Sequence, residues 1–137
     1  MKEHPDSRTA TAALRKATRG LLYMSESDEP FEIVHLEEPV RAFGAAEACL
    51  VAKRPAGCRV QEQRLEEFFG ELAQEHDWHG PSEKEDVRRY LDLWHYFKDY
   101  LAEATVFRVG ELHVDIVIVG KAADKRWVGV KTRAIET

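Results

Sequence analysis

The segment at residues 112–119 constrains the fold more than any other part of the sequence. Its alternate positions carry apolar side chains, which share one face of a strand because successive residues point to opposite faces. These positions are Leu112, Val114, Ile116 and Ile118. Val117 and Val119 add apolar side chains to the opposite face. A strand that is apolar on both faces is typical of the centre of a sheet covered by helices, so we expect an α/β fold around it.

The most regular helical pattern covers residues 82–102. Apolar side chains recur there at steps of three and four residues, which places them on one face of a helix. They are Val87, Tyr90, Leu91, Trp94, Phe97 and Leu101. Ser82, with Glu85 three residues later, predicts a capping box at the start of this helix. The apolar face should pack on the sheet.

Local signals predict the remaining elements. Asp6 or Ser7 can cap a first helix that runs to about Arg19, and Gly20 fits its C-terminal end. Composition predicts two more helices, at residues 40–54 and 64–74, and four more strands, at residues 31–36, 58–63, 105–109 and 127–135. Gly110 and Glu111 predict a two-residue type II′ hairpin turn. The resulting order, α–β–α–β–α–α–β–β–β, predicts a mixed sheet with helices packed on it, in a single domain over residues 1–137.

Composition narrows the class of protein. The chain has 137 residues, 44% hydrophobic and 33% charged, which is typical of one soluble globular domain. Its formal net charge of −5 argues against direct nucleic-acid binding, since phosphate contacts need a basic surface, and it permits a partner with a basic face.

The sequence also gives an expectation for the compartment. No stretch approaches the roughly 20 apolar residues of a membrane span, and the first residues have no apolar signal-peptide core. We therefore expect a cytoplasmic protein that does not contact a membrane. Disulfides rarely persist in the cytoplasm, so we expect Cys49 and Cys58 to be reduced thiols, with Cys49 partly buried.

Two groups of residues are candidates for a catalytic or metal site. His76 and His79, with Asp77 between them, have the spacing of metal ligands, but zinc needs further ligands and none follows at a useful spacing. His113 and Asp115 share a strand face, but an acid–base pair also needs a pocket. The sequence has neither a phosphate-binding loop motif nor a nucleophile elbow. We therefore predict no enzyme, no catalytic residue, no metal and no cofactor, and we keep a metal enzyme using the first group as the most distant alternative.

A short acidic segment is a candidate binding site. The apolar run at residues 21–24 and the strand at residues 31–36 should be buried and should fix the ends of the segment between them. We expect that segment to be a short exposed loop with Glu26, Asp28 and Glu29 at its tip. Taken alone, these acids are more typical of a solvated turn than of a site.

Two further features have the character of interaction anchors. Trp78 lies among polar and turn residues beside Asp77, so it either folds back onto the core or stands out as a binding hot spot. The sequence ends at Thr137, directly after strand residues. A strand that reaches the terminus would hold the terminal carboxylate in a fixed place, close to the charge of Glu136.

In these same segments the sequence resembles the nuclease A inhibitor family. The family's N-terminal block is matched by Leu21-Leu22-x-Met24-Ser25-Glu26-Ser27-x-x-Pro30-Phe31-Glu32. Its interhelical loop pair is matched by Asp77-Trp78, and its C-terminal blocks by Val106-x-Arg108-Val109-Gly110-Glu111-Leu112 and Glu136-Thr137. The similarity covers most of the chain and is poor at residues 39–64. The turn containing Lys125 and Arg126 departs from the family pattern.

The resemblance implies both a fold and a function. The fold is a three-layer α/β/α sandwich around a mixed sheet, of the PR-1-like type. The activity is stoichiometric inhibition of a magnesium-dependent, sugar-non-specific nuclease, with Glu26, Asp77, Trp78 and Thr137 as partner-binding residues. We therefore expect an inhibitor that occludes the active-site cleft of such a nuclease with acidic and C-terminal oxygen groups. The alternative is a protein-interaction module of the same fold with a different target.

Overall fold

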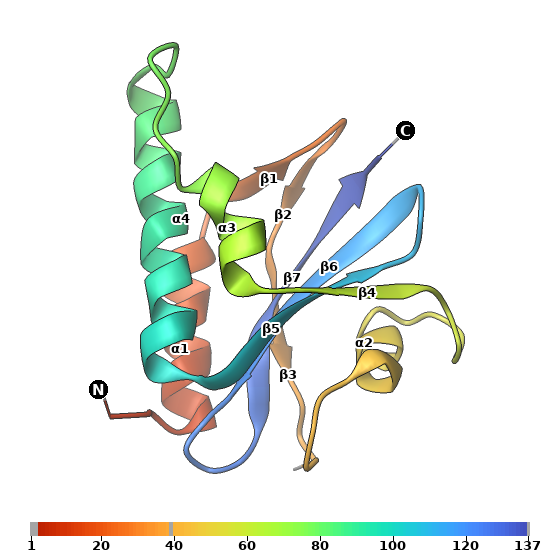
Figure 1. The fold of residues 1–137 in the computed structure, drawn as a ribbon. Coiled ribbons are helices and arrows are strands. Elements are labelled where there is room, and N and C mark those ends of the chain that lie inside the picture. The colour runs from red at the N-terminus through yellow and green to blue at the C-terminus, as the bar shows by residue number, and fades with distance from the viewer. Residues whose placement is uncertain (1–2, 39, 137) are drawn as a thin grey trace.

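The computed structural model describes residues 3–38 and 40–136, which form four helices and seven strands. Five strands make the main sheet, in the order β3 (Glu32–His35), β7 (Trp127–Ile135), β6 (His113–Lys121), β5 (Ala102–Val109) and β4 (Val60–Gln63). A separate hairpin consists of β1 (Leu22–Met24) and β2 (Asp28–Pro30) (Figure 1). The predicted central strand, now β6, therefore lies in the middle of the main sheet.

Every neighbouring pair of strands in the main sheet is antiparallel, so the predicted mixed sheet is wrong. β5, β6 and β7 follow one another through short turns, a connection that only antiparallel neighbours allow. β3 and β4 then join the two edges of this meander, each antiparallel to its neighbour. The direction of these edge strands depends on how the chain crosses the sheet. The order of elements along the sequence does not determine that path.

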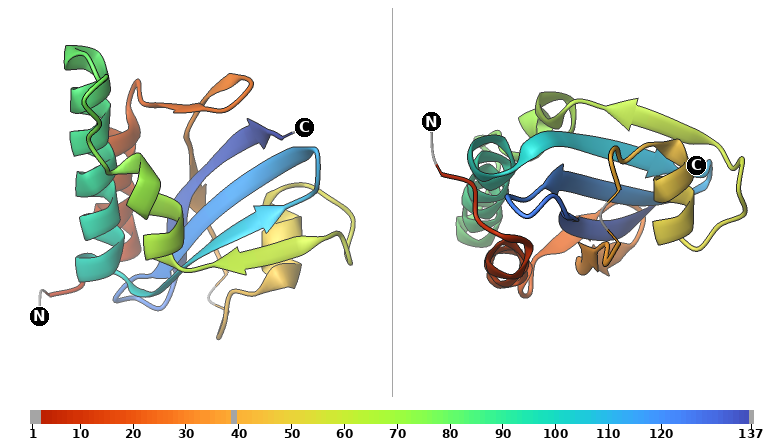
Figure 2. Two further views of the ribbon diagram at one scale, coloured as in Figure 1. Left: turned by 45° about the horizontal axis from the view of Figure 1, so that its top comes forward. Right: turned by 90° about the horizontal axis from the view of Figure 1, so that it is seen from below.

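Helices cover both faces of the sheet. α1 (Ser7–Thr18), α3 (Leu65–Leu72) and α4 (Pro81–Tyr100) share a core with Val114, Ile116 and Ile118 of β6. The short helix α2 (Ala45–Val51) shares a second core with Val117 and Val119. Figure 2 shows α2 apart from the other three helices. The prediction that β6 is buried on both faces is confirmed.

The predicted N-terminal cap is present at α1 and absent at α4. The Asp6 carboxylate caps α1 by accepting a hydrogen bond from the Thr9 amide at 2.8 Å, as predicted. The capping box predicted for α4 is wrong, because this helix begins at Pro81, with Gly80 as its N-cap. Proline suits the first turn of a helix, where its missing amide hydrogen is not needed. The Ser82 hydroxyl instead donates to the Glu83 carboxylate at 3.0 Å.

Two local predictions fail because of neighbouring segments. The helix expected at residues 40–54 is limited to α2, which begins after Gly44 and is followed by Lys53 in the left-handed conformation at φ +58°. The turn between β5 and β6 spans residues 110–112 instead of two residues. Gly110 has a φ of +103°, and its amide donates to the carbonyl of Arg59, the residue just before β4, at 2.9 Å, so this neighbouring segment takes part in the turn.

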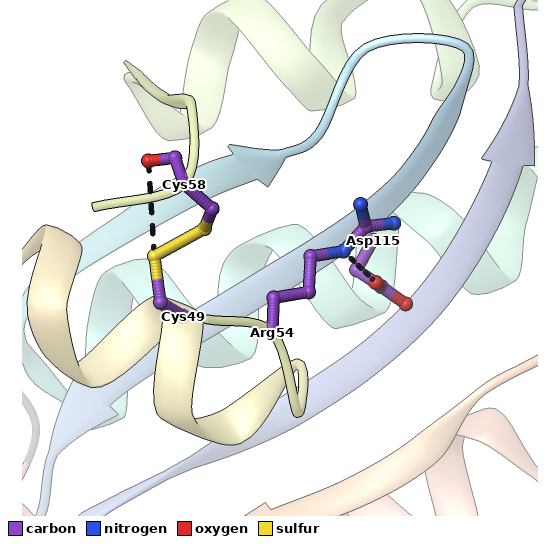
Figure 3. The surroundings of a disulfide bond; sticks show 4 residues. All are labelled: Cys49, Arg54, Cys58 and Asp115. Atoms are coloured by element: carbon purple, nitrogen blue, oxygen red, sulfur yellow. Dashed lines mark hydrogen bonds and ion pairs between the residues drawn. A yellow bond between two sulfur atoms is a disulfide. The ribbon is translucent and has the colours of Figure 1, made fainter. Parts of the chain in front are cut away.

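The prediction of two reduced thiols is also wrong, because Cys49 and Cys58 form a disulfide (Figure 3). A turn closed by the hydrogen bond from the Cys58 amide to the Pro55 carbonyl, at 3.2 Å, reverses the chain between them. Their Cα atoms consequently lie 6.5 Å apart, within the range that a disulfide can bridge. The bond joins α2 to the segment before β4, and Cys49 itself is buried.

Arg54 connects the same loop to β6 by a partly buried ion pair. Its Nε donates to a carboxylate oxygen of Asp115 at 2.9 Å (Figure 3). Its Nη2 donates to the His113 carbonyl at 2.6 Å. The Asp115 side chain is only 6% exposed, and its other oxygen lies 3.4 Å from Nε of Arg133. The Asp115 carboxylate is therefore paired with Arg54 of this loop and with Arg133 of β7, and this arrangement does not support an acid–base pair with His113.

Candidate functional site

The acidic segment is a hairpin and not the loop that we expected. β1 and β2 pair Leu22 with Pro30 and Met24 with Asp28, so the tip consists only of residues 25–27. The Ser25 amide closes it by donating to the Ser27 carbonyl at 2.9 Å. Glu26 is exposed at the centre of this tip, whereas Asp28 and Glu29 belong to β2. The geometry therefore separates Glu26 from the other two acids.

The hairpin is attached to the sheet through β7. The Ser25 hydroxyl, at the tip, accepts a hydrogen bond from the Ile135 amide at 3.1 Å. At the base of the hairpin, the Thr132 hydroxyl donates to the Pro30 carbonyl at 3.0 Å. These contacts hold the hairpin tip beside the last residues of β7.

The other side of the hairpin is attached to α3 and α4. The Tyr90 hydroxyl donates to the Leu22 carbonyl at 2.7 Å, and the Tyr23 ring stacks on Phe68 with ring centroids 5.8 Å apart. Burial raises the pKa of Tyr90, so its hydroxyl stays protonated and keeps donating at any pH the protein meets. The hairpin is therefore held from two sides by hydrogen bonds and ring contacts.

The described chain ends at Glu136, next to the hairpin tip. The Glu136 amide donates to the Leu112 carbonyl at 2.9 Å, and its carboxylate forms an ion pair with Arg108. Thr137, the predicted C-terminal contact residue, lies outside the described residues. The residue before it is nevertheless fixed by both its backbone and its side chain.

The loop between α3 and α4 presents the predicted pair Asp77 and Trp78 at the corner of a tight turn. The His79 amide donates to the His76 carbonyl at 3.0 Å, and the His76 amide donates back to Nδ1 of His79, also at 3.0 Å. The His76 ring stacks on Trp78 at 5.6 Å between ring centroids. The two histidines therefore build the turn, and within the described residues no group of three metal-ligating side chains is found.

Trp78 does not fold back onto the core, because 75% of its surface is exposed, and its role as a binding hot spot stays a prediction. Leu22 and Met24 of β1 are exposed as well, at 43% and 67%, although we expected this apolar run to be buried. Only Leu21 of that run is fully buried. The alternation along β1 points these two side chains away from the core, which a strand prediction for residues 22–24 would have indicated.

The three predicted contact elements lie at the same end of the molecule. Figure 1 shows the hairpin tip, the α3–α4 loop and the end of β7 together at that end, opposite the start of α1. We call the surface formed by residues 25–27, Asp77, Trp78 and Glu136 the binding end. The turn with Lys125 and Arg126 connects β6 to β7 at the opposite end of the sheet, so its positive charges are remote from the binding end.

The antiparallel sheet thus presents an acidic tip, an exposed tryptophan and Glu136 at one end of the molecule. The model of the nuclease A inhibitor-like protein family matches residues 8–137, nearly the whole chain, and the chain belongs to this family. The resemblance stated from the sequence is thereby confirmed. A comparison with individual curated proteins finds no match.

Family membership gives the general function. It places the protein among nuclease inhibitors, with a nuclease as the class of partner, and this is a family of inhibitors instead of enzymes. In the described part of the chain, no helix has the length and apolar character needed to cross a membrane.

Proposed function

We propose that the protein inhibits a magnesium-dependent, sugar-non-specific nuclease by inserting the binding end into its active-site cleft. The observation that carries this proposal is the meeting of the hairpin tip, the Asp77–Trp78 turn and the end of β7 on one surface. Each element is fixed by hydrogen bonds, and a preformed surface loses little conformational entropy when it binds.

The chemistry of the binding end fits such a cleft. A nuclease of this kind holds a magnesium ion and basic side chains for the scissile phosphate. Magnesium prefers hard oxygen ligands, so the Glu26 carboxylate and the oxygens of Thr137 would take the place of phosphate oxygens. Asp77 would meet a cationic side chain, and Trp78 would provide apolar contact area next to it. The inhibitor itself would hold no metal or cofactor and would catalyse no step.

Titration of a magnesium-dependent, sugar-non-specific nuclease with the protein tests the proposal. Degradation of plasmid DNA and of RNA should both stop at an end point near one inhibitor per nuclease, because one cleft serves both substrates. Magnesium is kept in large excess, so that simple chelation cannot imitate inhibition. If nuclease activity is unchanged at a large molar excess of the protein, the alternative of an interaction module with a different target replaces this proposal.

We expect Trp78→Ala to weaken inhibition by about 2 kcal/mol, as truncation of a hot-spot aromatic does. Its effect on the free energy of unfolding should be small, because the indole is 75% exposed and leaves no core cavity. Trp127→Ala is the matched control. Trp127 is 3% exposed, so this variant should lose roughly 3–5 kcal/mol of stability. Urea unfolding and the nuclease titration separate the two effects, and a large stability loss in Trp78→Ala would contradict its role as an anchor.

A short tag added after Thr137 is expected to weaken inhibition by about 2 kcal/mol or more, because it displaces the terminal carboxylate from the cleft. The melting temperature should not change, since Ile135 and Glu136 keep their bonds to the hairpin and to Leu112. The same tag placed before Met1 is the control, since Figure 1 shows the start of α1 at the opposite end of the molecule. Equal inhibition by the two tagged proteins would exclude insertion of the C-terminus.

We propose the three-layer arrangement of the PR-1-like type, which the two cores on opposite faces of the sheet support. We also propose a cytoplasmic location, although a disulfide such as Cys49–Cys58 is more typical of oxidising compartments. Thiol labelling of the protein in intact cells tests the location, because a cytoplasmic pool should contain the reduced form.

A further inference from the structure

A groove runs between β1, the α3–α4 turn and the first turns of α4. Its volume is about 430 Å³. Apolar groups form its walls, chiefly Leu22 and Met24 from β1 and Trp78 from the turn. These three side chains are exposed large apolar groups, at 43%, 67% and 75%. Exposed apolar side chains that gather in one groove are typical of an interaction site, whereas single exposed apolar side chains are common on any protein surface.

Acidic side chains give the groove a negative charge. Three carboxylates line it, from Glu71, Glu83 and Asp86, and none of the described lining residues is a lysine or an arginine. Two of these carboxylates have partners within the protein. Glu71 lies 3.4 Å from Nε2 of His76, and Glu83 accepts the hydrogen bond from Ser82.

Asp86 is the carboxylate that is left for a ligand. Its side chain is half-buried and makes no hydrogen bond or ion pair with the other described residues. It lies close to the hydroxyl of Tyr90, whose pKa is raised by burial and next by the negative charge of Asp86. A half-buried carboxylate without a counter-charge is costly, and a cation in the groove would lower this cost.

We propose that this groove binds an arginine side chain of the partner nuclease, with its methylene stem on Leu22 and Met24 and its guanidinium between Trp78 and Asp86. Arginine fits better than lysine, because a planar guanidinium stacks on an indole and donates several hydrogen bonds in one plane. A purely apolar side chain would leave the charge of Asp86 uncompensated. The inference rests on the proposed function and adds Leu22, Met24 and Asp86 to its contact surface.

The first test compares two variants of α4 in the nuclease titration. Asp86→Asn removes the charge in the groove and should weaken inhibition by about ten- to a hundredfold, the value of a hydrogen bond to a charged group. Glu85→Gln removes the same charge one residue earlier, at an exposed position outside the groove, and should change inhibition by less than about threefold. Equal losses in both variants would mean general charge attraction. They would overturn the groove proposal and leave the nuclease proposal standing.

The second test needs no nuclease. The peptide acetyl-Gly-Arg-Gly-amide is titrated into the protein while the indole resonance of Trp78 and the methyl resonances of Leu22 and Met24 are followed by NMR. The arginine peptide should shift them, and the same peptide with citrulline, a neutral side chain of nearly the same shape, should not. Asp86→Asn should abolish the response and Glu85→Gln should keep it. Equal shifts with the two peptides, or no shift at tens of millimolar, would overturn the proposal even if the protein inhibits the nuclease.

Discussion

Replacing Glu26 with glutamine is expected to weaken inhibition of the nuclease by about 2–5 kcal/mol, the cost of leaving a buried charge of the partner without its counter-charge. Glu26 lies at the centre of a three-residue tip, whose backbone is closed by the Ser25 amide and attached to β7 through the Ser25 hydroxyl. The carboxylate is thus presented at a defined position. Inhibition constants measured at a fixed magnesium concentration give the loss directly.

Asp28→Asn and Glu29→Gln are the controls for this variant. Both acids belong to β2, and Glu29 is partly buried, with its carboxylate 3.4 Å from the Ser27 hydroxyl. Each should cost less than about 1 kcal/mol, mostly through the association rate. Thermal stability of the Glu26 variant should hardly change, since its side chain is exposed. A similar loss in all three variants would show that net negative charge acts at the interface and that Glu26 has no special position.

Elements with a strong local pattern could be predicted from the sequence. The alternation in β6 and the three- and four-residue spacing in α4 correctly located the centre of the sheet and the longest helix. A fully buried strand must be apolar on both faces, and a helix on a sheet must be apolar on one. The burial of such an element is therefore visible in the spacing of its apolar residues. The Asp6 cap belongs to the same group, since its hydrogen bond reaches only three residues along the chain.

The features that could not be predicted depend on contacts between distant segments. The antiparallel edge strands follow from the path of the chain around the sheet. The Cys49–Cys58 bond joins α2 to the segment before β4, in a loop that also contacts β6 through Arg54. The expectation of free thiols rests on the expected compartment and takes no account of the distance between the two cysteines. The composition predicts too long a helix here because alanine and glutamate favour a helix in general, whereas Val40 and Phe43 pack against the second core ahead of the helix.

The candidate site was predicted in part. The family motif located Glu26 and the Asp77–Trp78 pair, and the structure brings their segments to one end of the molecule. The sequence did not indicate the groove, because the apolar run at residues 21–24 is expected to be buried, whereas Leu22 and Met24 are exposed. That expectation treats the segment alone, and the groove exists only where β1 meets the α3–α4 turn.

The loop that carries the disulfide supports the sheet that carries the binding end, and its main contact can be tested. We expect Arg54→Met to reduce the free energy of unfolding by about 3 kcal/mol, because it leaves the buried Asp115 carboxylate with only Arg133. Methionine keeps most of the aliphatic stem, so lost packing contributes little. Urea denaturation at neutral pH, with the disulfide intact, measures the change.

Arg59→Met is the matched control for this effect. Arg59 forms an ion pair of similar length with Glu111, at 3.0 Å, but these two side chains are 72% and 67% exposed. Water screens an exposed pair, so this variant should lose less than about 1 kcal/mol. Adding Asp115→Asn to Arg54→Met should recover part of the stability, since no charge is then left buried without its main partner. Equal losses in the two single variants, or no recovery in the double variant, would show that the ion pair between the disulfide loop and β6 does not hold this side of the sheet.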